Sequence, residues 1–303
     1  MKNLSIVILT YNEELNIKKC LIEAKKLTLN IIIVDSYSTD RTLEICKEYG
    51  CDIYQNKFIN QAIQLNWALE SIEFKTEWIL RLDSDEYFLT ELIEEMKNRL
   101  DTLDESITGI FFRRRVYFMD KWIRYGGYYP TLILRAWRNK KAICEERWMD
   151  EHMRLLKGKS ITFENDFVDD NKKNLHWWIS KHNNYATREA IEQLNSKYGF
   201  LDYEPLKADI FGSQEQKKKW LKEKVYNSLP LGIKPFIYFF YRYIAKGGFL
   251  DGFRGFLFHI LQGFWYRFLV DAKVYECEKK AKDSGKSIKE VIENEYKIKL
   301  GED

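Results

Sequence analysis

Short apolar runs alternate with amphipathic stretches in the first part of the chain. The runs Leu4–Leu9, Ile31–Val34 and Trp78–Leu82 are short and mostly apolar, which is typical of strands buried on both faces. Between them, apolar residues recur at helical spacing. Strand–helix–strand order with short connections predicts an α/β fold with a mainly parallel sheet covered by helices.

Polar residues predict where the intervening helices begin and end. Asn12 is expected to cap the first helix, with Glu13 and Glu14 near its positive end. Asp40 is expected to cap the second helix, and Gly50 to stop it.

Three polar clusters follow the three apolar runs directly. They are Thr10-Tyr11-Asn12, Asp35-Ser36 and Asp83-Ser84-Asp85. In parallel sheets, ligands bind at the carboxyl ends of the strands. The sequence therefore predicts that these clusters meet at one edge of the sheet and form a site.

The Asp83-Ser84-Asp85 triplet predicts a cation. Two carboxylates one residue apart at the end of a buried strand are costly unless a positive charge lies between them. Mg²⁺ or Mn²⁺ carrying a substrate diphosphate meets that need, because both ions prefer oxygen ligands. Short acidic triplets are also common in surface loops. The metal-site interpretation therefore depends on the polar clusters at the neighbouring strand ends as well as on the triplet.

The pattern changes after residue 107. The basic run Arg113–Arg115 lies among strand-like residues, and Thr131–Trp137 is another expected strand. Trp148–His152 places two carboxylates and an imidazole beside aromatic residues, and a helix is expected over Asn174–Leu194. Along that helix Lys181, His182 and Tyr185 are open to two interpretations, acceptor binding or a solvated face.

Two stretches near the end of the chain are aromatic and nearly free of acidic residues, and a Lys- and Glu-rich helix is expected after them. Leu231–Ala245 and Phe249–Val270 carry Phe, Tyr and Trp at helical spacing with basic flanks, which is typical of helices lying in a membrane interface. A core helix or a subunit contact is the alternative. We expect a catalytic domain over residues 1–225 and membrane-associated amphipathic helices over residues 226–303, with bends at Gly247, Gly248 and Gly252.

The amino-acid composition narrows the possible classes of protein. The 303 residues are 45% apolar and 31% charged with a net charge of +3, which predicts a globular chain with no nucleic-acid partner. Five cysteines without metal-type spacing favour reduced thiols in the cytoplasm. No run reaches the ~18 apolar residues of a spanning helix, and the N-terminus does not read as a secretory signal.

Ser5–Glu13, Ile33–Asp40 and Leu82–Asp85, in this order, resemble a family-2 glycosyltransferase of the GT-A nucleotide-sugar-binding fold. The rest of the chain, with Lys246–Gly252 before an aromatic helix, resembles more loosely the bacterial branch that builds lipopolysaccharide core or related lipid-linked glycans. Ser36 stands where many family members have a second Asp that helps to recognise a uracil-type base. Of the two acidic residues, this chain keeps Asp35.

The resemblance implies inverting transfer of a hexose from a nucleotide-diphosphate sugar, with a UDP-sugar expected, to a hydroxyl of a glycan or lipid-linked glycan. The enzyme would act at the inner face of the cytoplasmic membrane. Asp85 is the expected ligand of Mn²⁺ or Mg²⁺. The residues expected to bind the donor are Thr10, Tyr11, Asn12, Glu13, Asp35, Arg81, Asp83 and Ser84.

Inversion requires one general base that takes the acceptor proton. Glu151 is the first choice by position and resemblance, and Asp150 is the second. A surface salt-bridge cluster with Arg147 and Arg154 is the alternative for this pair.

Two other functions are compatible with an α/β fold that carries acidic residues at the ends of its strands. A sugar nucleotidylyltransferase would carry a Gly-rich basic loop after the first strand, where this chain has Thr10–Glu14. A catalytically inactive membrane-bound scaffold would not need intact carboxylates at the strand ends.

Overall fold

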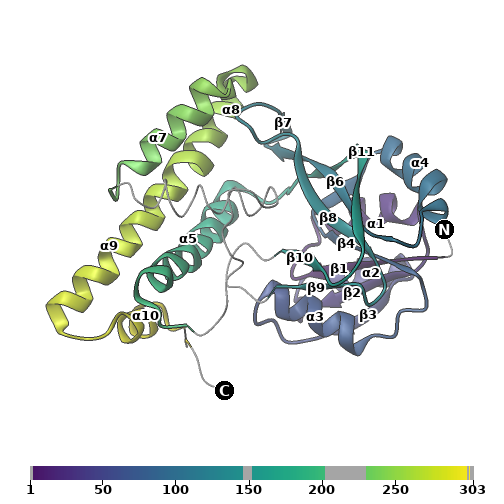
Figure 1. Ribbon diagram of the computed structural model, residues 1–303, viewed down its shortest axis with the longest axis horizontal. Helices are drawn as coiled ribbons and strands as arrows, with labels where there is room; N and C mark the ends of the chain where they lie inside the picture. Colours follow the sequence, from purple (N-terminus) through teal and green to yellow (C-terminus); the bar gives the residue numbers. More distant parts are fainter. Residues whose placement is uncertain (1–2, 146–151, 202–229, 299, 301–303) are drawn as a thin grey trace. The chain divides into compact units, whose positions relative to one another are not determined.

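The computed structural model describes residues 3–145, 152–201, 230–298 and 300 (Figure 1). The chain divides into two compact units, an N-terminal unit of residues 1–173 and a C-terminal unit of residues 174–303. The expected domain boundary between residues 225 and 226 lies outside the described residues.

A nine-stranded sheet forms the centre of the N-terminal unit, with the order β3-β2-β1-β4-β8-β6-β11-β5 and with β7 paired to β6. A separate ladder joins β9 and β10. The strands are β1 (Leu4–Thr10), β2 (Ile31–Asp35), β3 (Asp52–Gln55), β4 (Trp78–Asp83), β5 (Glu86–Phe88), β6 (Ile107–Phe118), β7 (Lys121–Ile123), β8 (Thr131–Arg138), β9 (Ala142–Cys144), β10 (Met153–Leu155) and β11 (Lys159–Asp169). The helices are α1 (Ile17–Lys25), α2 (Thr42–Glu48), α3 (Gln61–Ser71), α4 (Thr90–Arg99) and the short η1 (Leu100–Thr102).

Most strands of the sheet point the same way. The pairs β3–β2, β2–β1, β1–β4 and β6–β11 are parallel, whereas β8 is antiparallel to both β4 and β6. It follows that β1, β2, β3, β4, β6 and β11 all end at the same edge. The expected α/β fold with a mainly parallel sheet is confirmed.

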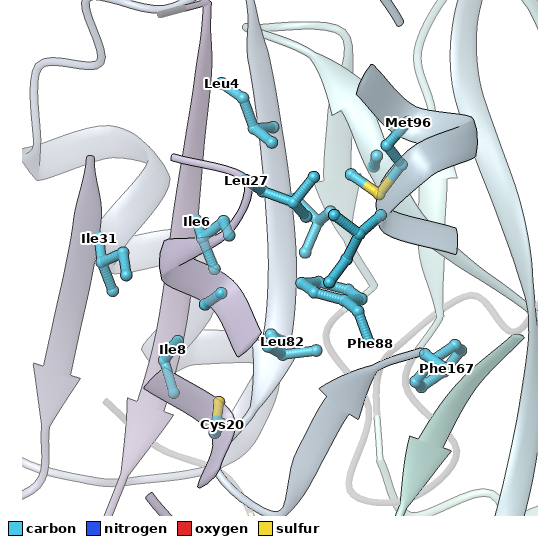
Figure 2. Packing of buried hydrophobic residues seen from close by; sticks show 14 of the residues in the cluster. Leu4, Ile6, Ile8, Cys20, Leu27, Ile31, Leu82, Phe88, Met96 and Phe167 are labelled. Carbon is cyan, nitrogen blue, oxygen red and sulfur yellow. The ribbon is translucent and has the colours of Figure 1, made fainter. Parts of the chain in front are cut away.

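Two hydrophobic clusters pack on opposite faces of the sheet. Leu4, Ile6 and Ile8 of β1 belong to one cluster and Val7 to the other, because successive side chains of a strand point to opposite faces. Figure 2 shows the first cluster, in which Cys20 of α1, Met96 of α4 and Phe88 of β5 also lie. Helix α3 contributes to the second cluster through Ala62, Leu65 and Ala68. Continuous apolar runs are therefore required in the central strands.

The expected cap of the first helix was wrong. Helix α1 begins at Ile17 with Asn16 in the cap position, and Asn12 lies in the preceding loop with a left-handed φ of 54°. Asn is among the residue types that adopt this conformation most readily. Around α2 the expected cap is one residue off, because Arg41 occupies the cap position without a side-chain cap bond, although Asp40 Oδ1 accepts from the Thr42 N–H at 3.0 Å. The expected stop is confirmed, since Gly50 follows the helix with a φ of +62°.

Helices make up the C-terminal unit. They are α5 (Leu175–Tyr198), α7 (Lys234–Phe240), the π-helical turn η3 (Tyr241–Ala245), the 3-10 turn η4 (Gly248–Asp251), α8 (Gly252–Phe258), the π-helical turn η5 (His259–Trp265), α9 (Tyr266–Ser284) and α10 (Ile288–Tyr296). Tyr266 Oη donates to Glu189 Oε2 at 2.6 Å between α9 and α5. Lys234 Nζ lies 2.8 Å from Asp271 Oδ1, with both side chains buried, so α7 is tied to α9 by an ion pair.

Asn174 caps α5, because its Oδ1 accepts from the Trp177 N–H at 3.0 Å, in agreement with the helix expected from that residue. The expected bends also appear, since Gly247 and Gly252 both adopt a φ of +69°. Over the described residues no helix combines the length and apolar character that crossing a membrane requires.

Candidate active site

The ends of three parallel strands bring the predicted polar clusters together. In the strand register Thr10 of β1 lies opposite Asp35 of β2, and Leu9 lies opposite Asp83 of β4. Thr10 Oγ1 donates to Asp35 Oδ1 at 2.9 Å. The strand-end positions chosen from the sequence thus occupy adjacent places at one edge of the sheet.

Asp35 is fully buried and holds this edge together. Besides Thr10, its carboxylate accepts from Ser38 Oγ at 2.5 Å and from the Ser38 N–H at 2.8 Å. Gln55 Nε2 donates to Asp35 Oδ2 at 3.3 Å. These four bonds match the acceptor capacity of a carboxylate, so Asp35 shapes the loop after β2 and positions Gln55.

The loops after β1 and β2 are bonded to each other. The Asn12 N–H donates to Ser38 Oγ at 2.9 Å, and Asn12 Oδ1 accepts from the Thr39 N–H at 2.8 Å. Tyr11 and Tyr37 are both exposed, and Tyr37 has a left-handed φ of 62°. The two cross-linked loops therefore present two aromatic rings to solvent beside the strand ends.

Arg135 of β8 lies between two acidic side chains. Its Nη2 donates to Asp83 Oδ2 at 3.0 Å and also to Glu86 Oε1. Arg81 donates to Asp83 Oδ1 from Nε at 3.2 Å and from Nη2 at 3.1 Å. Two arginines and two acidic side chains thus form one ion network at the end of β4.

The ion network shifts the acidity of both carboxyl groups. Burial opposes ionisation of Asp83, but the charges of Arg135 and Arg81 hold the pKa of Asp83 below its usual value. Burial raises the pKa of Glu86 to about 8, with the nearby Asp83 charge adding to the rise. Ser84 is buried in the turn that follows Asp83.

Asp85 has different partners from Asp83. Its Oδ2 accepts from the neutral amide of Asn171 at 2.8 Å, and its backbone oxygen accepts from the Asp170 N–H at 3.0 Å. A neutral donor orients a carboxylate without cancelling its charge. Within the triplet, Asp83 is neutralised by arginine and Asp85 is positioned by an amide, so Asp85 is the better ligand for an added cation.

The segment after β11 also belongs to this edge. The Lys172 N–H donates to Asn16 Oδ1 at 2.8 Å, and Lys173 Nζ lies 2.7 Å from Glu13 Oε1. Burial raises the pKa of Glu13 above its usual value despite the bonds from Lys173 and Asn16. This segment was not predicted as part of the site, although Asp170-Asn171-Lys172-Lys173 follows a strand directly, as the three predicted clusters do.

The two residues proposed as the base, Asp150 and Glu151, lie outside the described residues. The chain on either side of them is paired, because Cys144 of β9 lies opposite Met153 of β10. Asn66 of α3 fixes β9 by donating to the Cys144 oxygen at 2.9 Å and accepting from the Cys144 N–H at 3.0 Å.

The residues singled out on α5 form an aromatic group of the C-terminal unit. His182 stacks on Trp178 with ring centroids 3.5 Å apart, and Lys181 Nζ lies 5.6 Å from the ring centroid of Tyr185. Burial lowers the pKa of His182 to about 4, which keeps its ring neutral at physiological pH.

Comparison with known proteins identifies the family. A family model described as glycosyl transferase family 2 matches residues 5–156, which is half of the chain. The chain belongs to glycosyl transferase family 2. The match spans all three motifs that carried the resemblance.

Relatives of this family-2 transferase are similar along nearly their whole length. An uncharacterized glycosyltransferase of Rickettsia typhi is 25% identical over 288 residues, covering 93% of this chain and 90% of the relative. The lipopolysaccharide core biosynthesis glycosyltransferase LpsC of Rhizobium meliloti is 27% identical over 278 residues, covering 90% and 92%. Both names are those of glycosyltransferases, in agreement with the family match, and this chain is a glycosyltransferase.

Among solved structures, the mannosyltransferase PcManGT of Pyrobaculum calidifontis, in complex with GDP-Man and Mn²⁺, has a TM-score of 0.48 and 13% identity to this family-2 transferase. The likeness covers 92% of this chain and 86% of that one.

Proposed function

We propose that this transferase moves a hexose from a UDP-sugar to a hydroxyl of a glycan or lipid-linked glycan, with inversion and with a divalent metal, in bacterial surface polysaccharide synthesis. The similarity to LpsC along most of the chain supports an acceptor of lipopolysaccharide-core type. The observation that carries the proposal is the division of labour in the acidic triplet, where Asp83 is paired to arginines and Asp85 is held by Asn171.

The cross-linked loops after β1 and β2 would bind the nucleoside. Tyr11 and Tyr37 offer exposed ring faces for the base, and Asn12 joins the two loops. Thr10 and Asp35 act beneath them by fixing the loop conformation. Glu13 keeps the first loop attached to Lys173.

Asp85 fits a single-carboxylate metal site. Over the described residues no group of three or more His, Cys, Asp or Glu side chains could hold a metal ion, and in the proposed site the donor diphosphate and water supply the remaining ligands. Mg²⁺ commonly binds proteins in this way, through one or two carboxylates and substrate phosphates. Bound there, Mn²⁺ or Mg²⁺ would supply positive charge against the departing diphosphate. Ser84, Arg81 and Asp83 would keep the triplet in place.

Inverting transfer needs one in-line displacement. The acceptor oxygen forms its bond to the anomeric carbon as the bond from that carbon to the diphosphate oxygen breaks. The nucleoside diphosphate leaves with the bonding electrons, and the acceptor proton passes to a carboxylate. We assign that role to Glu151, with Asp150 as the alternative.

Two further assignments complete the proposal. Residues 1–225 would form the catalytic domain, and residues 226–303 would hold the enzyme at the inner face of the cytoplasmic membrane, where a lipid-linked acceptor is found. The aromatic helices with basic flanks support this location.

Thermal-shift measurements with nucleotides test the donor assignment. UDP or a UDP-sugar with Mn²⁺ is expected to stabilise the enzyme, and a ligand at about 100 times its Kd adds about 2.7 kcal/mol. Asp85→Asn should abolish the metal-dependent part of the shift, while Asp52→Asn, at an exposed Asp of β3, should leave it unchanged. A larger shift with GDP than with UDP would make a GDP-sugar the donor in place of a UDP-sugar. No shift with any nucleotide would contradict the proposal.

A second measurement tests the base. Glu151→Gln is expected to retain the nucleotide shift and lose sugar transfer. Transfer that survives in Glu151→Gln but is lost in Asp150→Asn would move the role to Asp150.

A further inference from the structure

The C-terminal unit contains an antiparallel helical hairpin, formed by residues 234–245 and 252–265, that is closed by a glycine-rich turn. Near the open end Phe236 and Phe264 lie with ring centroids 4.6 Å apart. Near the turn the ring of Tyr243 lies 5.7 Å from that of Phe256 and 5.6 Å from that of His259. The two arms are thus packed on each other by aromatic rings along their length.

Close backbone packing fixes the turn. A Cβ on Gly248 would lie 2.4 Å from Nε2 of His259, which is fully buried. A Cβ on Gly255 would lie 2.3 Å from the Cβ of Asp251. Neither position can carry a side chain without moving its neighbour, so close packing fixes the backbone of the turn at both glycines.

The fixed turn exposes large apolar side chains. Phe253 is 73% exposed and Leu250 is 57% exposed, and Phe249 is also exposed. We call the stretch from Lys246 to Arg254 the hairpin tip. An exposed apolar group of this kind marks an interaction surface rather than a core.

Charge indicates what the hairpin tip contacts. Lys246 and Arg254 are both exposed at the tip. Between Pro230 and Val270 the sequence has one acidic residue, Asp251, and its side chain is buried beneath Gly255. The exposed charges of the tip are therefore basic and border its apolar side chains. An anionic lipid surface matches both properties, since basic residues bind its headgroups and aromatic residues enter the interface.

We propose that the hairpin tip is the membrane-docking element of this enzyme, with Phe249, Leu250 and Phe253 entering the interface of an anionic bilayer and Lys246 and Arg254 contacting lipid phosphates. The inference rests on the proposed function in one respect, namely that a lipid-linked acceptor brings the enzyme to a membrane. It goes further by assigning the contact to one turn and by requiring anionic lipid.

Vesicle flotation of the full chain tests the docking element. Phosphatidylcholine vesicles with phosphatidylglycerol should bind the wild type, and pure phosphatidylcholine vesicles should bind it more weakly. Leu250→Asn/Phe253→Asn should weaken binding by about tenfold or more because a large apolar area is lost. Lys246→Gln/Arg254→Gln should weaken binding to anionic vesicles by about fivefold per removed charge.

A matched variant controls for the loss of exposed apolar side chains in general. Leu29 and Tyr275 are 75% and 60% exposed and lie outside the hairpin, and Leu29→Asn/Tyr275→Asn should bind vesicles as the wild type does. The proposal is wrong if Leu250→Asn/Phe253→Asn binds vesicles as well as Leu29→Asn/Tyr275→Asn does. It is also wrong if lipid charge does not change the binding of the wild type, or if the wild type binds no vesicles. A wild-type dimer that the tip variant dissociates, without vesicle binding, would also overturn it, in favour of a second copy covering the tip.

Nucleotide binding measured on the same samples separates this inference from the proposed function. Tip variants should keep the wild-type shift with UDP and Mn²⁺. Vesicle binding without any nucleotide shift would contradict the donor assignment and leave the docking element standing. A nucleotide shift without vesicle binding would contradict the docking element and leave the donor assignment standing.

Discussion

Asn171 Nδ2 donates to Asp85 Oδ2 at 2.8 Å, and this bond joins the ends of two strands that are far apart in the sequence. Asn171 follows β11, whereas Asp85 follows β4. The adjacent Asp170 N–H donates to the Asp85 backbone oxygen at 3.0 Å. The segment after β11 thus orients both the backbone and the side chain of the residue that we assign to the metal.

Removing this amide should weaken metal-dependent donor binding. Asn171→Ala is expected to lower the affinity for UDP in the presence of Mn²⁺ by about tenfold, because a hydrogen bond to a charged group contributes about 1.5–3 kcal/mol. Binding without metal should change little. Titration calorimetry with and without Mn²⁺ measures both values.

Asn165 in β11 offers a matched control. Its Nδ2 donates to Glu95 Oε2 at 3.0 Å, so Asn165→Ala also removes an amide–carboxylate bond, from a carboxylate other than Asp85. The positioning role of Asn171 would be refuted by equal losses of donor affinity in the two variants.

Arg135 should be essential for the stability of the N-terminal unit. Arg135→Met leaves Asp83 with one arginine and removes the hydrogen bond that buried Glu86 accepts from the guanidinium. Removing one partner of a buried ion pair costs about 3–5 kcal/mol. Urea unfolding should show a loss of this size, whereas Arg41→Met, which removes an exposed pair with Glu44, should unfold close to the wild type. A small effect at Arg135 would mean that the ion network adds little to stability.

The sequence predicted the strand ends but not which strands are neighbours. Apolar runs placed Thr10, Asp35 and Asp83 at carboxyl ends, and the parallel register brought them together. Arg135 reaches the site because β8 pairs with β4, and the order of strands in a sheet is set by long-range pairing that local periodicity does not encode.

The conformation of the loops could not be predicted from the sequence pattern either. Asn12 looked like a helix cap, yet its side chain bonds to Thr39 of another loop. Asn suits caps and left-handed turns equally, so the residue type alone could not choose between them. The same limit applies to Tyr37, whose exposure beside Tyr11 depends on the cross-linked loops.

Acidification should destabilise the C-terminal unit. Burial lowers the pKa of His182 to about 4 and the pKa of His259 to about 4, from an ordinary value of 6.5. Between these values the unfolded chain binds more protons than the folded chain, so stability is fully present above pH 6.5 and declines as the pH falls towards 4. Each group contributes up to about 3 kcal/mol to this decline.

Chemical unfolding monitored by tryptophan fluorescence at pH 7.5 and pH 5 measures the effect. His182→Gln keeps a donor for the Trp178 oxygen, which lies 2.9 Å from His182 Nδ1, and should flatten the pH dependence. His176→Gln changes an exposed side chain of α5 and should keep the wild-type profile. An unchanged profile in His182→Gln would remove this histidine from the explanation.

Gly248 should tolerate no side chain, and the chain provides its own control. Gly248→Ala would place a Cβ 2.4 Å from the buried His259 ring, and such overpacking typically costs about 1–3 kcal/mol. Gly263 lies in the same hairpin with nothing within 4 Å of its Cβ position. Gly263→Ala should be neutral or stabilise by up to about 1 kcal/mol, because Ala favours helix over Gly. Thermal melts should therefore show a lower melting temperature for Gly248→Ala and an unchanged or higher one for Gly263→Ala. If both variants melted at the wild-type temperature, the hairpin turn would be looser than the contact between Gly248 and His259 indicates, and its tip would lose the fixed shape on which membrane docking depends.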